Sequence, residues 1–173
     1  MILSADFQRI TTLIFDIDGT LTDGRIAYDA SGNVVKFFDV RDLHWLKLAL
    51  RAGLNVGVLS GRHDSANDLM IADVKLSFAL QGSKDKVAGF EQLLRENGLT
   101  AAECLCVGDD VVDMPVLCRA GIGVAVADAV PELDEVAAFR TVAPGGRGAA
   151  AEIVRMVLKE KNLFDQIMER YRR

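Results

Sequence analysis

The sequence predicts an α/β fold, a three-layer sandwich in which helices cover both faces of a mostly parallel central sheet. Two observations carry this prediction. Short apolar runs rich in Val, Ile, Leu and Phe alternate with longer amphipathic stretches along the chain. Acidic residues directly follow the first apolar run, at the place where open parallel sheets form their ligand crevice. The expected architecture is therefore Rossmann-like.

The strands are expected at the apolar runs, namely Thr12–Phe15, Val56–Leu59, Leu76–Leu80, Leu105–Val107 and Ile122–Val126. Cys104 and Cys106 are two positions apart, which places both on one face of a strand, as core thiols. Helical periodicity appears between and after the strands, near Asp42–Ala52, Asp64–Ala72, Asp85–Asn97, Val112–Ala120, Pro131–Val136, Gly148–Lys161 and Leu163–Tyr171.

One segment interrupts this alternation. Arg25–Asp29 and Asn33–Phe38 are extended runs joined by Ala30-Ser31-Gly32, which indicates a β-hairpin. No larger insertion follows the first acids, so residues 25–38 are expected to form only this hairpin, projecting from the end of the first strand. We expect one domain over residues 1–173, with a helical tail over residues 148–173.

The composition limits the classes of function. Half of the 173 residues are apolar and 26% are charged, as in ordinary soluble globular proteins. The net charge of −5 argues against nucleic acid or an anionic membrane as a partner. No window approaches a membrane span and the three cysteines lack metal-ligand spacing, so a cytoplasmic protein is expected.

Two aspartates, Asp16 and Asp18, follow the first strand, and Gly19 and Thr20 come directly after them. Neighbouring carboxylates repel each other, so such pairs usually hold a cation or share acid and base chemistry. An Asp-Gly pair alone would be explained by a turn in which Asp18 bonds its own backbone. The complete string from strand to Asp-x-Asp-Gly-Thr favours a catalytic role.

Three further polar signals follow the ends of other expected strands. Ser60-Gly61-Arg62 comes after the second strand, and Lys84 and Lys86 stand at the start of a helix. The third signal places three acids around another helix start: Asp109, Asp110 and Asp113. Each signal alone is weak, since such residues commonly form turns, caps or solvated surface. Their order and their shared position after strand ends make the combination specific.

In these motifs the chain resembles the haloacid dehalogenase superfamily of phosphohydrolases over nearly its whole length. It is similar in particular to members whose cap is reduced to a hairpin. The supporting strings are Asp18-Gly19-Thr20-Leu21-Thr22-Asp23-Gly24, Val40-Arg41-Asp42, Ser60-Gly61-Arg62, Gly108-Asp109-Asp110, Asp113-Met114-Pro115 and Gly145-Gly146-Arg147-Gly148. The resemblance implies a Mg²⁺-dependent phosphomonoesterase that hydrolyses 3-deoxy-D-manno-octulosonate 8-phosphate in lipopolysaccharide precursor synthesis, through an aspartyl-phosphate. A nonulosonate 9-phosphate or another small phosphate ester is the alternative substrate.

The resemblance also implies a role for each motif residue. Asp16 would attack phosphorus, and Asp18 would protonate the departing sugar oxygen and later take a proton from water. Mg²⁺ would bind Asp16, Asp109 and the backbone carbonyl of Asp18. Lys86 would neutralise charge on the transferring group. Cations are required because two like unit charges 4 Å apart repel by ~1 kcal/mol in water and ~4 kcal/mol near a protein surface.

Substrate contacts are expected from two loops. The Ser60 hydroxyl beside Gly61 and the exposed amides near Gly19 and Thr20 would hold phosphate oxygens. Arg62 would grip the phosphate or the carboxylate of a sugar acid, unless it is only a surface arginine at a helix start.

Other positions leave alternatives open. Asp113 would orient Lys86 or metal-bound water, or cap a helix, and Asp110 would support the metal from outside its ligand shell. Family spacing selects Lys86 over Lys84, which is expected to be solvated. Leu43-His44-Trp45 stands where the family has small glycines. These side chains would narrow the mouth of the pocket, or Trp45 would pack into the core or a subunit contact.

The resembled proteins form tetramers, so a homotetramer is expected, with the hairpin Arg25–Phe38 in its core. Two other classes of function compare less well with the sequence. A signalling receiver domain combines similar residues in a different chain order. A non-catalytic phospho-acceptor or assembly protein has no use for so many clustered acids.

Overall fold

The computed structural model describes residues 4–173, and its centre is a six-stranded sheet with the strand order β5-β4-β1-β6-β7-β8. Every pairing between neighbouring strands of this sheet is parallel. The strands are β1 (Thr12–Phe15), β4 (Asn55–Leu59), β5 (Phe78–Leu80), β6 (Cys104–Gly108), β7 (Ile122–Ala125) and β8 (Phe139–Arg140). The predicted parallel sheet is confirmed.

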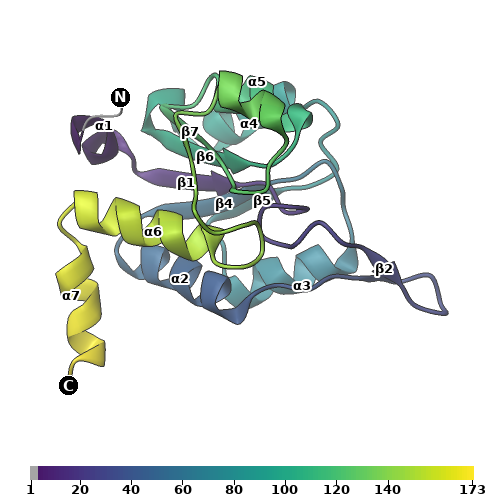
Figure 1. Ribbon diagram of the computed structural model, residues 1–173, viewed down its shortest axis with the longest axis horizontal. Helices are drawn as coiled ribbons and strands as arrows, with labels where there is room; N and C mark the ends of the chain where they lie inside the picture. The colour runs from purple at the N-terminus through teal and green to yellow at the C-terminus, as the bar shows by residue number, and fades with distance from the viewer. Residues whose placement is uncertain (1–3) are drawn as a thin grey trace.

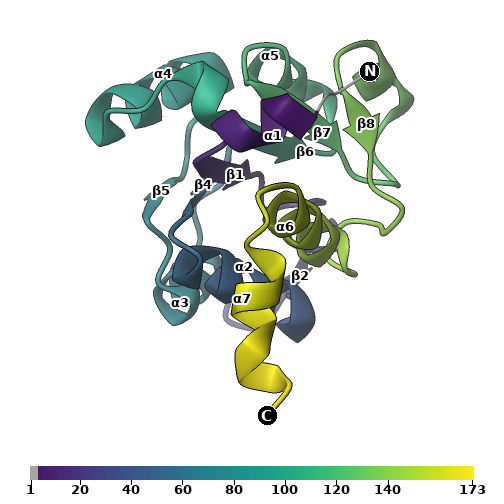
Figure 2. The same ribbon diagram turned by 90° about the vertical axis from the view of Figure 1, so that its left-hand side faces the viewer.

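Helices cover both faces of the sheet, which gives the three layers seen edge-on in Figure 2. One face is covered by α2 (Val40–Arg51), α3 (Ser65–Val74) and α6 (Ala149–Glu160), and the other by α4 (Lys86–Asn97) and α5 (Met114–Leu117). Two short helices, α1 (Ser4–Arg9) and α7 (Phe164–Met168), lie at the end of the sheet away from the hairpin (Figure 1). Within residues 4–173, no helix has the length and hydropathy of a bilayer span.

The alternation of side chains along each strand divides the apolar residues between two cores. Leu13 and Phe15 of β1 pack with the α2–α3–α6 layer, whereas Ile14 packs with α4 and α5. Cys104 and Cys106 are both buried in the second core, as their spacing predicts. Burial on both faces explains why the strands are continuous apolar runs.

The predicted hairpin is present and projects from the body of the molecule (Figure 1). Its antiparallel strands are β2 (Ala27–Tyr28) and β3 (Val34–Val35), with Ala27 opposite Val35. The connecting turn is closed by Asp29, whose Oδ1 accepts hydrogen bonds from the amides of Ser31 and Asn33 at 2.8 Å each. These hydrogen bonds lie within the turn itself, so its conformation does not depend on contacts with the six-stranded sheet.

Several boundaries differ from the sequence prediction. The helix expected at Val112–Ala120 is a 3₁₀ turn, Val111–Asp113, followed by the single-turn α5, and the one expected at Pro131–Val136 is the 3₁₀ helix Pro131–Glu135. Short 3₁₀ segments share the apolar spacing of one α-helical turn, so periodicity does not separate them. The strand expected from Leu76 begins at Phe78, and α1 and β8 were not predicted because each is too short to show a period.

Candidate active site

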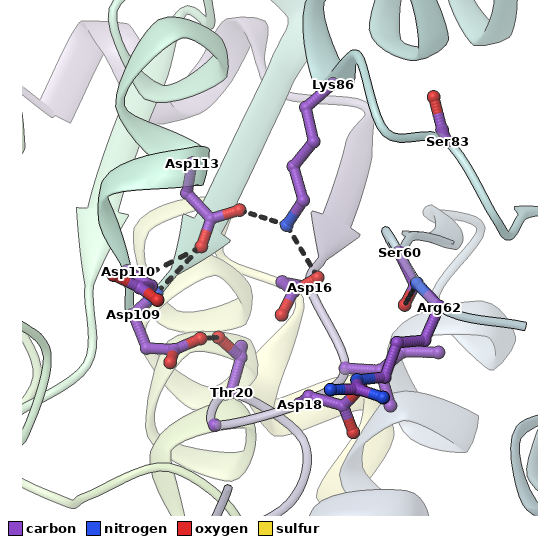
Figure 3. A network of polar contacts seen from close by, with 12 residues as sticks. Asp16, Asp18, Thr20, Ser60, Arg62, Ser83, Lys86, Asp109, Asp110 and Asp113 are labelled. Carbon is purple, nitrogen blue, oxygen red and sulfur yellow. Dashed lines mark hydrogen bonds and ion pairs between the residues drawn. The ribbon is translucent and has the colours of Figure 1, made fainter.

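The motif residues gather at the carboxyl ends of β1, β4 and β6 (Figure 3). The chain runs from β1 outward to β4 and β5, then returns to β6 on the other side of β1. Such a reversal of direction opens a crevice at the strand ends. A cleft of about 450 Å³ lies there, lined by Asp16, Asp18, Gly24, Ile26, Ser60, Gly61, Arg62, Ser83, Lys84, Lys86, Asp110 and Val112.

Lys86 lies at the inner end of this cleft between two carboxylates. Its Nζ donates to Asp16 Oδ1 at 2.7 Å and also to Asp113 Oδ1. All three side chains are buried. Burial lowers the pKa of Lys86, but the two carboxylates outweigh it and raise that pKa above its ordinary value. Lys86 is therefore a fixed ammonium, and it comes from the first position of α4, whose N-cap is Asp85.

Three carboxylates converge beside that ammonium. Oxygens of Asp16, Asp109 and Asp113 all lie within 4.8 Å of one another. Burial is the main cause that raises the pKa of Asp16 to about 6, with Asp113 adding to it and Lys86 opposing it. Burial, then the charges of Asp16 and Asp113, raise the pKa of Asp109 to about 7. Oxygen ligands such as those of Asp16 and Asp109, whose raised pKa values oppose ionisation until a positive charge is near, fit a hard divalent cation.

The loop after β1 positions Asp109. Thr20 Oγ1 donates to Asp109 Oδ1 at 2.9 Å. Gly19 has φ of +96°, and a Cβ at this position would lie 2.0 Å from Asp109 Oδ2. Only glycine combines that backbone conformation with so close an approach. The Gly-Thr pair of the motif therefore holds the carboxylate that follows β6.

Asp113 contacts both Lys86 and the backbone amides at the start of the 3₁₀ turn. Its Oδ1 binds Lys86, while its Oδ2 accepts from the backbone amides of Asp109 at 3.0 Å and Asp110 at 3.3 Å. Asp110 is exposed at the rim of the cleft, and its Oδ1 accepts from the Val111 amide at 2.7 Å, so it caps the short 3₁₀ turn.

Asp18 faces away from the carboxylate cluster. Its Oδ1 lies 2.7 Å from Lys36 Nζ, and its Oδ2 lies 3.6 Å from Arg62 Nε. The carboxylate of Asp18 is thus not brought to the expected metal site, since these two cations attract it to the other wall of the cleft. Its backbone carbonyl as a metal ligand stays a prediction.

Sequence reasoning missed Lys36. It is the single charged residue in Val34-Val35-Lys36-Phe37-Phe38, and its side chain is completely buried. A lone lysine in an apolar run is a signal that could have identified it, because a buried ammonium needs partners.

The second loop contributes Ser60, Gly61 and Arg62 to the cleft, as predicted. Ser60 Oγ accepts from the amide of Arg62 at 3.2 Å, which closes the turn after β4. The Arg62 side chain is 55% exposed and leans over the cleft beside Asp18 (Figure 3). Lys84 is exposed on the same cleft wall.

Gly19 and Thr20 are the expected phosphate-binding residues that the structure does not place on the cleft. The amide of Gly19 donates to Thr22 Oγ1 at 3.2 Å, and the amide of Thr20 donates to the Ile17 carbonyl at 3.3 Å. The Thr20 hydroxyl is bound to Asp109. These donors close the loop on itself, and the structure gives the pair a role in positioning Asp109. Phosphate binding by Gly19 and Thr20 stays a prediction.

Leu43, His44 and Trp45 do not line the cleft. Trp45 stacks on Phe164 of α7 with ring centroids 6.1 Å apart, and the Arg155 guanidinium lies 4.3 Å from its ring centroid. Of the two expectations for this segment, packing of Trp45 within the molecule is confirmed and narrowing of the pocket mouth is wrong. Phe164 of α7 and Tyr171 after it thus contact the side chains of Trp45 and His44 on α2.

Comparisons with known proteins agree with this geometry. The family model described as haloacid dehalogenase-like hydrolase matches residues 79–152. The 3-deoxy-D-manno-octulosonate 8-phosphate phosphatase KdsC of Escherichia coli (strain K12) is 34% identical over 94% of this chain and 86% of its own length. The protein of the same name from Haemophilus influenzae is 35% identical over 91% of this chain and 89% of its own length.

Solved structures of octulosonate 8-phosphate phosphatases are also similar to this chain. The 3-deoxy-D-manno-octulosonate 8-phosphate phosphatase from Moraxella catarrhalis, in complex with magnesium ion, phosphate ion and a KDO molecule, superposes with a TM-score of 0.93 at 28% identity, covering 97% of both chains. A cobalt-bound phosphatase from Haemophilus influenzae superposes with a TM-score of 0.88 at 34% identity, covering 92% of this chain and 93% of that one.

The chain therefore belongs to the haloacid dehalogenase-like hydrolases, as its motifs indicate. Within them, both named relatives and both structures are called octulosonate 8-phosphate phosphatases.

Proposed function

We propose that this protein is a Mg²⁺-dependent phosphomonoesterase that hydrolyses 3-deoxy-D-manno-octulosonate 8-phosphate to the free sugar acid and phosphate. The observation that carries the proposal is the arrangement around Lys86. A buried ammonium bound to Asp16 and Asp113 lies at the inner end of an open cleft, with Asp109 beside it. A nucleophilic carboxylate, a fixed positive charge and a cation site thus share one place, as an attack on an anionic phosphate requires.

The reaction assigned to these residues has two steps, formation of an aspartyl-phosphate and its hydrolysis. Lys86 occupies Oδ1 of Asp16, so Oδ2 is the oxygen that attacks phosphorus and forms an aspartyl-phosphate. Asp18 gives a proton to the departing sugar oxygen, then accepts one from the water that hydrolyses the aspartyl-phosphate. Asp109 and Asp16, with the backbone carbonyl of Asp18, would hold Mg²⁺. When bound, that ion supplies positive charge against the phosphate oxygens.

The wall of the cleft supports a sugar-acid substrate. Arg62 and Lys84 are exposed there, next to Ser60. A sugar-acid phosphate carries a carboxylate in addition to its phosphate, and a guanidinium binds carboxylates bidentately. The cleft volume of about 450 Å³ suits a small metabolite. The relatives' names support the octulosonate ester as the substrate, and a nonulosonate 9-phosphate is the alternative. A place in lipopolysaccharide precursor synthesis is part of the proposal and rests on the resemblance alone.

We also propose that residues 1–173 work as one domain and assemble as a homotetramer through the hairpin cap. Tyr28 and Phe37 of the hairpin each keep 66% of their surface exposed, and Val35 beside them is 39% exposed. Apolar side chains gathered on a projecting segment favour a protein contact. Sedimentation of the purified protein tests this part; a stable, fully active monomer at low concentration contradicts it.

The test of the activity is phosphate release by the purified protein from three esters: octulosonate 8-phosphate, a nonulosonate 9-phosphate and 4-nitrophenyl phosphate. We expect turnover with Mg²⁺, none with EDTA, and the highest kcat/KM for the octulosonate ester. Asp16→Asn is expected to abolish turnover while the protein still folds without metal. Hydrolysis retained by Asp16→Asn excludes Asp16 as the nucleophile, and preference for the nonulosonate ester selects the alternative.

A further inference from the structure

Lys36 lies where the hairpin meets the body of the molecule. It directly follows β3, and its side chain has no exposed surface. Three oxygens surround its Nζ: Asp18 Oδ1 at 2.7 Å, Asp64 Oδ2 at 2.7 Å and Asn67 Oδ1 at 3.0 Å. These three oxygens of the protein enclose the ammonium. Burying a lysine costs free energy that a solvated position avoids, so this arrangement calls for a reason.

Two of these oxygens belong to the start of α3. Asp64 is the N-cap of that helix and accepts from the Asn67 amide at 3.0 Å, and Asn67 is itself fully buried. Their positions are therefore set by the helix rather than by Lys36. Since they hold the ammonium from one side, its place is fixed relative to α3, and the third oxygen, from Asp18, is drawn to a fixed point.

Because of this attraction, the two carboxylate oxygens of Asp18 have different environments. Oδ1 is buried against Lys36 and makes no hydrogen bond of good geometry, so it is held by charge. The side chain of Asp18 is nevertheless 19% exposed and lines the cleft. Oδ2 is then the oxygen available to the cleft, where the exposed Arg62 lies 3.6 Å away.

We propose that Lys36 is a positioning residue, which holds Asp18 so that Oδ2 faces the leaving oxygen of the substrate. This inference rests on the proposed function, in which Asp18 transfers the proton. The proton passes from Asp18 Oδ2 to the sugar oxygen as the phosphorus–oxygen bond breaks, and Oδ1 stays paired with Lys36. Because Lys36 belongs to the cap, the hairpin contributes directly to the proton-transfer step.

The test compares two esters whose leaving groups differ in their need for a proton. Departure of 4-nitrophenolate needs little protonation, whereas departure of a sugar alkoxide depends on a general acid. For Lys36→Met we expect kcat/KM to fall about tenfold to hundredfold with the sugar-acid phosphate and less than about threefold with 4-nitrophenyl phosphate. Lys47→Met is the matched control, since Lys47 pairs with Asp73 at 2.9 Å away from the cleft and its loss should leave both values unchanged.

A purely structural role for Lys36 predicts equal losses with both esters, and that result, or no loss at all, overturns the inference. Lys36→Gln, which keeps a donor in the same space, provides the same comparison if the methionine variant does not fold. In an Asp18→Asn background, adding Lys36→Met should cause no further loss of kcat/KM. If the double variant instead loses as much as the product of the two single losses, the inference is also overturned. A wild-type protein that hydrolyses neither ester refutes the proposed function itself, which separates the two failures.

Discussion

Replacing Asp113 by alanine tests whether its carboxylate stabilises both the buried ammonium of Lys86 and the backbone of the loop after β6. Its Oδ1 binds Lys86, and its Oδ2 accepts from the amides of Asp109 and Asp110. Alanine leaves these amides without their acceptor and the ammonium with Asp16 alone. Breaking a buried ion pair by removing one partner costs about 3–5 kcal/mol. We therefore expect Asp113→Ala to lower the free energy of unfolding by about that amount.

The measurement is urea unfolding at pH 7 in EDTA, followed by circular dichroism, so that no bound cation compensates for the lost charge. Asp110→Ala is the matched control, because Asp110 is a neighbouring aspartate that also caps the 3₁₀ turn but is exposed. Loss of an exposed cap costs about 1 kcal/mol. Equal losses in the two variants, or a loss below about 1 kcal/mol in Asp113→Ala, refute the reasoning that Asp113 stabilises a buried charge.

Three further outcomes are expected. Burial raises the pKa of Asp16 to about 6 and of Asp109 to about 7 in the folded protein, so the metal-free fold binds more protons than the unfolded chain between pH 4 and 7. Its stability should therefore fall as pH rises through that window, and Mg²⁺ should raise the melting temperature more at pH 7.5 than at pH 5; equal increments contradict this. Arg62→Ala should reduce kcat/KM by about tenfold or more for sugar-acid phosphates and much less for 4-nitrophenyl phosphate, and equal losses remove its selective role. Trp45→Ala should release the tail, measured as faster proteolysis after α6, with kcat unchanged; a lowered kcat would connect the tail to the cleft.

Much of the fold and of the site was predictable because the relevant signals are local. The apolar runs at Thr12–Phe15 and Leu105–Val107 identify buried strands, and residues that follow parallel strands meet at one edge of the sheet. Asp16, Lys86 and Asp109 were expected together for that reason, and the structure places them together. This prediction needs only the positions of the motifs along the chain and does not depend on the direction in which each side chain points.

The sequence by itself thus determined which polar residues follow the ends of the strands, and the family to which the chain belongs. Only the tertiary structure decided which partner each side chain takes. The carboxylate of Asp18 pairs with Lys36 rather than joining those of Asp16 and Asp109, and the Thr20 hydroxyl binds Asp109. Trp45 packs on α7 rather than at the cleft. These choices depend on distances between segments that are far apart in the chain, which arise only when the hairpin, the loops and the tail pack against the finished sheet.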